Sequence, residues 1–139
     1  MDEGSRLDLS KYRFERANNS VKVAKRDFEC GDFNESVSRS YYAVFYALLA
    51  VTELDGFESS KHSGVISHFS LVYLKTNIFD RKLSELINTA FKLRHRADYE
   101  GLYEVNADNA KARINAAEEV IRIIEPYLIL RWKELEDNK

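Results

Sequence analysis

The apolar residues of this chain recur at spacings of three and four, a pattern that places them along one face of an α-helix. In residues 9–29 this apolar stripe consists of Phe14, Ala17, Val21, Ala24 and Phe28. Cys30 and Gly31 follow it, and a glycine directly after the last periodic residue is typical of a helix C-terminus. The pattern therefore predicts a first helix over residues 9–29.

A second helix should begin immediately after this turn. Asp32 with Glu35 three residues later has the spacing of a capping box, in which each side chain satisfies a backbone N–H of the first turn. Residues 41–51 are apolar nearly all the way round the helix, so they must be covered on two sides. The second helix is therefore expected at the centre of the core.

The rest of the chain continues the helical pattern. Apolar spacing predicts a third helix over residues 61–75 and a fourth over residues 80–99. Asn106 is a natural N-cap for a long last helix, which Pro126 should kink or interrupt with a new turn. Residues 131–139 are polar and are expected to fray as a tail.

The chain has few turn residues and no segment in which apolar and polar residues alternate as in a β-strand, so an all-α fold is favoured. The 139 residues contain one proline and five glycines, which favours an all-α, up-and-down bundle of four to five helices. We expect residues 1–130 to form a single domain, since this length supports one core.

Charge and composition narrow the function and the compartment. A formal net charge of −2 argues against a protein that coats nucleic acid, although a local basic patch is compatible with it. The single cysteine, Cys30, cannot form an internal disulfide, which favours a reducing cytoplasm. No stretch approaches the roughly 18 apolar residues of a membrane span, and the N-terminus lacks an apolar signal segment. We expect a cytoplasmic protein without membrane contact.

Two short motifs carry the candidate chemistry. One is SRSYYAVFY at residues 38–46 of the second helix, and the other is LRHRADY at residues 93–99, at the end of the fourth. We interpret Tyr41, Tyr42 and Tyr46 as core, because aromatic residues at helical spacing usually pack inside. The second motif is interpreted as the functional site.

Together with KHSGVI at residues 61–66, these motifs resemble those of the small HEPN-domain proteins of prokaryotes. The resemblance covers most of the chain and implies a helical bundle that usually dimerises. In many members an arginine, four to six residues and a histidine form a ribonuclease site across the dimer. Other members pair with a minimal nucleotidyltransferase, often as toxin and antitoxin.

The sequence departs from the arginine–histidine pattern. After Arg94 and four further residues comes Tyr99, and no histidine follows. His95 is adjacent to Arg94 and points about 100° away on a helix, so it cannot simply take over the role. A phenol, with a pKa near 10, is a poor acid or base at neutral pH. Tyr99 could instead position a phosphate or, by analogy with related pairs, accept a nucleotide from a partner nucleotidyltransferase.

Four residues are candidates for binding a ligand: Arg39, Arg94, Asp98 and Tyr99. Arg94 and Asp98 lie one turn apart and either share this site or form an ordinary surface ion pair. Tyr99 lies about 140° from Arg94 on an ideal helix, so the two converge only at an irregular helix end or across two subunits. We favour a homodimer, because a two-fold interface brings the same patch from both chains together. Arg39 either reaches a phosphate beside Arg94 or is solvated.

Two functions remain open, besides a helical bundle that keeps the fold and binds no ligand. The favoured one is a HEPN-like module that binds a nucleotide or RNA, docks a minimal nucleotidyltransferase, or both, as part of a toxin–antitoxin pair. The alternative is a metal-independent ribonuclease toxin in which Arg94 stabilises the transition state and Tyr99 or His95 replaces the histidine. His62 and His68 are six residues apart, which does not match a helical metal pair, so no metal and no cofactor are expected.

Overall fold

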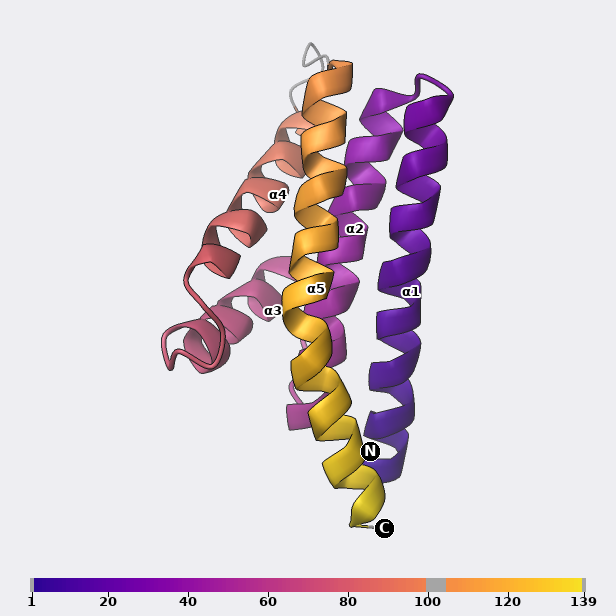
Figure 1. The fold of residues 1–139 in the computed structure, drawn as a ribbon. Helices are drawn as coiled ribbons and strands as arrows, with labels where there is room; N and C mark the ends of the chain where they lie inside the picture. The colour runs from indigo at the N-terminus through magenta and orange to yellow at the C-terminus, as the bar shows by residue number, and fades with distance from the viewer. Residues whose placement is uncertain (1, 100–104, 139) are drawn as a thin grey trace.

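Five α-helices make up most of the computed structural model, which describes residues 2–99 and 105–138, without the side chains of residues 95–99 (Figure 1). The helices are α1 (Glu3–Glu29), α2 (Phe33–Thr52), α3 (His62–Phe69), α4 (Lys82–Tyr99) and α5 (Ala107–Asp137). A 3₁₀ turn, Glu53–Asp55, follows α2, and a π-helical turn, Ser70–Leu74, follows α3. No strand occurs in these residues, so the expected all-α bundle is confirmed.

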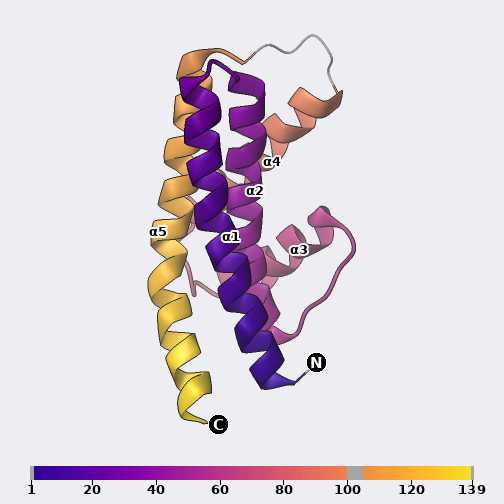
Figure 2. The same cartoon turned by 90° about the vertical axis from the view of Figure 1, so that its right-hand side faces the viewer.

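The long helices α1, α2 and α5 run side by side, and α3 and α4 lie together on one side of them (Figures 1 and 2). The two ends of the chain lie at the same end of the bundle. As expected, α2 is central, because it packs on α1, α5, α4 and α3. Its close contact with α1 uses small residues: Ser36 is fully buried and its hydroxyl donates to the Ala24 carbonyl over 2.8 Å.

The beginning of the chain differs from the expectation in two places. Helix α1 begins at Glu3 rather than near residue 9, because the Asp2 carboxylate accepts a hydrogen bond from the Ser5 N–H over 2.7 Å and caps a polar first turn. The capping box at Asp32 is wrong, since the Asp32 side chain caps no N–H of α2. The turn itself is confirmed, with Gly31 at a φ of 80°.

The expected third helix over residues 61–75 is in fact two elements. The α-helix ends at Phe69, and the following turn is wider, with the Lys75 N–H donating to the Ser70 carbonyl over 2.9 Å. This turn buries two consecutive side chains, Tyr73 and Leu74. Tyr73 lies beside Phe69, with ring centroids 5.2 Å apart.

Helix α5 begins as expected and ends later than expected. The Asn106 side chain accepts from the Asn109 N–H over 2.8 Å, which confirms the N-cap. The helix continues past Pro126 to Asp137, so the expected frayed tail is wrong. Trp132 explains the difference, because its ring packs edge-on against Phe14 with centroids 5.8 Å apart.

Candidate functional site

Arg94 of α4 reaches across to the aromatic residues of α2. Its Nη2 donates to the Tyr42 hydroxyl over 2.8 Å, and its Cζ lies 5.0 Å from the ring centroids of both Tyr41 and Tyr42. Arg94 and Tyr42 are each half-buried, whereas Tyr41 is buried. A guanidinium over two aromatic faces gains about 0.5–2 kcal/mol from each cation–π contact. These contacts hold the planar cation of Arg94 in one orientation.

His62, the first residue of α3, completes this cluster. A hydrogen bond of 2.9 Å joins its Nδ1 to the Tyr41 hydroxyl, and its ring centroid lies 4.0 Å from that of Phe45. Burial lowers the pKa of His62 below its ordinary 6.5, and the positive charge of Arg94 lowers it further. Both effects favour the neutral form of His62. We call Arg94, Tyr41, Tyr42 and His62 the Arg94 cluster.

The loop before α3 fixes the position of His62. The Ser59 hydroxyl bonds to both the N–H and the carbonyl of Lys61, each over 3.2 Å. A Cβ added at Gly64 would lie 2.3 Å from the Ser59 hydroxyl oxygen, so any larger residue would force the Ser59 side chain out of its present position. The KHSGVI motif thus positions the imidazole at the edge of the Arg94 cluster.

A cavity of about 380 Å³ lies beside His62, between α1, α2, α3 and the loop that joins α2 to α3. Arg13 and Glu53 face it and form an ion pair, with 3.6 Å between Arg13 Nε and Glu53 Oε1. Burial raises the pKa of Glu53 above 4.5, although the nearby Arg13 opposes this. The cavity offers a small polar ligand or a base both apolar walls and charged groups.

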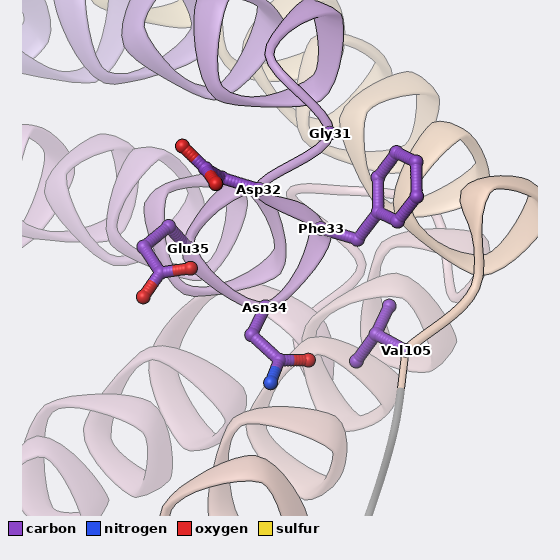
Figure 3. A pocket seen from close by; sticks show the side chains of 6 residues that line it. All are labelled: Gly31, Asp32, Phe33, Asn34, Glu35 and Val105. Atoms are coloured by element: carbon purple, nitrogen blue, oxygen red, sulfur yellow. The ribbon is translucent and has the colours of Figure 1, made fainter.

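A second pocket, of about 330 Å³, lies at the α1–α2 turn (Figure 3). Its lining consists of Gly31, Asp32, Phe33, Asn34, Glu35 and Val105. The carboxylates of Asp32 and Glu35 lie on one side, and Phe33 and Val105 on the other (Figure 3). This lining includes no basic side chain, so the pocket does not suit a phosphate.

Among the residues expected to bind a ligand, the structure brings Arg94 into the cluster. Arg39 is exposed on α2, and the described residues provide it with no hydrogen bond or ion pair. The side chains of Asp98 and Tyr99 lie outside the described residues, so their convergence with Arg94 stays a prediction.

The interpretation of the three α2 tyrosines as core residues is confirmed for Tyr41 and only in part for Tyr42 and Tyr46. Tyr41 is buried, whereas Tyr42 and Tyr46 are half-buried, with hydroxyls that bond to arginines of neighbouring helices. Sequence reasoning also missed His62 as a site residue. The KHSGVI motif contains this histidine, but the spacing of His62 from His68 gives no indication of a contact with α2 or α4.

Two further properties bear on the kind of site. Among the described residues, no group of three or more His, Cys, Asp or Glu side chains is arranged to hold a metal ion. No helix in the same part of the chain has the length and apolarity needed to cross a bilayer.

Comparison with known proteins agrees with this architecture. The family model named HEPN domain matches residues 10–127. The chain is 30% identical over 115 residues to a protein of Methanocaldococcus jannaschii named "Putative toxin MJ0142", covering 83% of this chain and 78% of that protein. It is 33% identical over 120 residues to a UPF0332 protein of Thermotoga maritima, covering 86% and 91%, respectively. A UPF0332 protein of Archaeoglobus fulgidus is 34% identical over 113 residues, covering 81% and 89%. The chain therefore belongs to the HEPN domain family.

Proposed function

We propose that this HEPN domain binds a phosphate group of a nucleotide or of RNA at the Arg94 cluster and acts within a toxin–antitoxin pair. The observation that carries the proposal is the fixed guanidinium of Arg94, held by the Tyr42 hydroxyl and by the faces of Tyr41 and Tyr42. These contacts fix the orientation of the cation. A pre-oriented guanidinium matches the paired oxygens of a phosphate. The toxin-related name of the Methanocaldococcus relative supports the cellular role.

The proposal includes two partners. A second copy of the chain would bring another Arg94 and Tyr99 to a shared axis, as a two-fold interface does. A minimal nucleotidyltransferase would be the other member of the pair. Co-purification of this domain with the product of a neighbouring nucleotidyltransferase reading frame would support the second partnership, and separate elution of the two proteins would count against it.

Substituting Arg94 by alanine is expected to weaken the binding of a fluorescein-labelled single-stranded RNA about tenfold or more, because a hydrogen-bonded charge contributes about 1.5–3 kcal/mol. Fluorescence anisotropy at fixed salt measures this change. The control is Arg122→Ala, which removes the same charge from an exposed position on α5 where the arginine pairs with Glu119. Equal affinity of the two variants would exclude Arg94 as the phosphate-binding group.

Cleavage of RNA is the second candidate function, and the position of His62 favours it. The motif lacks a histidine after Arg94, but α3 supplies an imidazole to the same cluster. In the reaction, the 2′-hydroxyl oxygen attacks the adjacent phosphorus while His62 accepts the hydroxyl proton. The phosphorus–O5′ bond breaks, water protonates the departing oxygen, and His62 returns its proton to solvent. The products are a 2′,3′-cyclic phosphate and a 5′-hydroxyl, and Arg94 stabilises the charge on the phosphoryl oxygens.

If His62 is this base, His62→Asn is expected to reduce cleavage about a hundredfold while leaving RNA affinity unchanged. Asparagine keeps a polar atom near Nδ1 for the Tyr41 hydroxyl but cannot accept the proton. The rate for the unmodified protein should increase with pH until the pKa of His62, below 6.5, and then level off, because only neutral imidazole accepts a proton. Gel analysis of a labelled RNA between pH 5 and 8 measures both effects. Binding without cleavage by the unmodified protein would leave the domain as a binding module.

A further inference from the structure

Tyr46, one helical turn after Tyr42, is held by an arginine in the same way. Arg16 of α1 donates from Nη2 to the Tyr46 hydroxyl over 2.9 Å and lies with its Cζ 4.8 Å from the Tyr46 ring centroid. Its Nη1 donates to the Tyr12 hydroxyl over 3.2 Å, and the Tyr12 ring is 49% exposed. Helix α2 thus carries two tyrosines on one face, each bound by an arginine from a different neighbouring helix.

These two arrangements are adjacent. The rings of Tyr42 and Tyr46 have centroids 6.1 Å apart. Helix α2 lies between α1, which carries Arg16, and α4, which carries Arg94 (Figure 2). The result is a continuous strip from α4 to α1 in the order Arg94, Tyr42, Tyr46, Arg16 and Tyr12. We call Tyr12, Arg16, Tyr42, Tyr46 and Arg94 the arginine–tyrosine strip.

Arg16 gives the strip an exposed positive charge although the chain has a net charge of −2. Arg16 is exposed, its hydrogen bonds go to two phenol oxygens, and no carboxylate in the described part of the chain forms an ion pair with it. Exposed Arg39 lies one turn before Tyr42 on the same face of α2. The acidic residues of this face stand at its two ends, Glu35 before Arg39 and Glu53 beside Arg13.

We propose that Arg16, Tyr12 and Tyr46 form a second nucleotide subsite, which extends the Arg94 site across α2 and binds the neighbouring nucleotides of a single-stranded RNA. This inference rests on the proposed phosphate binding at Arg94. Arginines interspersed with aromatic rings suit single strands, because guanidinium groups contact the backbone phosphates while unpaired bases stack on exposed rings. A double helix would not present its bases to Tyr12. The strip therefore selects an unpaired segment at least several nucleotides long.

The test compares RNA ligands of increasing length. For Arg16→Ala we expect affinity for a single-stranded octanucleotide to fall about tenfold, with a less steep salt dependence because one phosphate contact is lost. Affinity for a mononucleotide should not change, because that ligand occupies only the Arg94 cluster. Tyr12→Ala should weaken octanucleotide binding about fivefold or more through lost stacking, whereas Tyr12→Phe should retain most of it. Arg122→Ala serves as the matched control, and circular dichroism verifies folding of each variant.

Several outcomes would overturn the second subsite. Unchanged octanucleotide affinity in Arg16→Ala would do so, and so would an equal loss for mononucleotide and octanucleotide. If Arg16→Ala instead dissociates an oligomer in sedimentation velocity without changing RNA affinity, the strip is a contact with a second copy. If the Arg94 proposal is wrong, the result differs. Arg94→Ala then binds both ligands with normal affinity, while Arg16→Ala still has reduced affinity for the octanucleotide.

Discussion

Phe69→Ala is expected to lower the free energy of unfolding by about 3–5 kcal/mol. Phe69 is fully buried at the end of α3, and its ring stacks against Tyr73 and Phe79 with centroids 5.2 and 5.6 Å away. Alanine would leave a cavity where α3, the π-helical turn and the segment before α4 meet. Urea unfolding followed by circular dichroism at 222 nm measures the change.

Leu71→Ala is the matched control, because Leu71 is an apolar residue in the same turn that is 60% exposed. Its removal should change the free energy of unfolding by no more than about 0.5 kcal/mol. A loss of similar size in both variants would show that Phe69 does not hold this region together. The comparison also concerns function, since α3 carries His62 and its packing determines where the imidazole lies.

The helices could be predicted where apolar spacing was regular. The all-α class, the centrality of α2, the turn at Gly31 and the cap at Asn106 all follow from local signals that the structure preserves. Helix ends were less predictable. Asp2 caps α1 while Asp32 caps nothing, although both precede a helix, because capping depends on a backbone geometry that composition does not specify.

The candidate site was harder to predict because its members come from three helices. Arg94 was identified from its own motif, but its partners Tyr42 and His62 lie 52 and 32 positions earlier in the chain, and only the packing of α2, α3 and α4 brings them together. Side chains along one helix can be related by spacing alone, whereas contacts between helices depend on crossing geometry. Because spacing along α2 does not show contacts with other helices, it indicates a core position for Tyr42 and Tyr46 and misses their arginine partners.

The Arg94 cluster and the arginine–tyrosine strip both use tyrosines of α2 that are bound by arginines of neighbouring helices. Buried Tyr41 packs in the core and also lies under the Arg94 guanidinium, whereas half-buried Tyr42 turns its hydroxyl to Arg94 at the surface. One aromatic helix can therefore serve as core on one side and as a ligand platform on another. Substitutions on the buried side should change stability, and those on the strip should change ligand affinity.

In the C-terminal segment, Trp132→Ala is expected to lower the free energy of unfolding by about 3 kcal/mol. The Trp132 ring packs on Phe14, and its Nε1–H donates to the hydroxyl of fully buried Ser10 over 2.9 Å. Ser10 in turn donates to the Ala50 carbonyl over 2.5 Å, so one chain of hydrogen bonds joins α5, α1 and α2. Urea unfolding measures the change.

Two comparisons separate packing from hydrogen bonding at Trp132. Trp132→Phe keeps an aromatic ring beside Phe14 but removes the indole N–H, so it should lose only about 1 kcal/mol. Leu130→Ala removes a 57% exposed side chain from the same turn of α5 and should have almost no effect. If Trp132→Ala were as stable as Leu130→Ala, the indole of Trp132 would contribute nothing to the stability of the bundle. The large loss that we expect for Trp132→Ala would instead make this segment a structural part of the domain, because the indole joins α5 to α1 through Phe14 and Ser10.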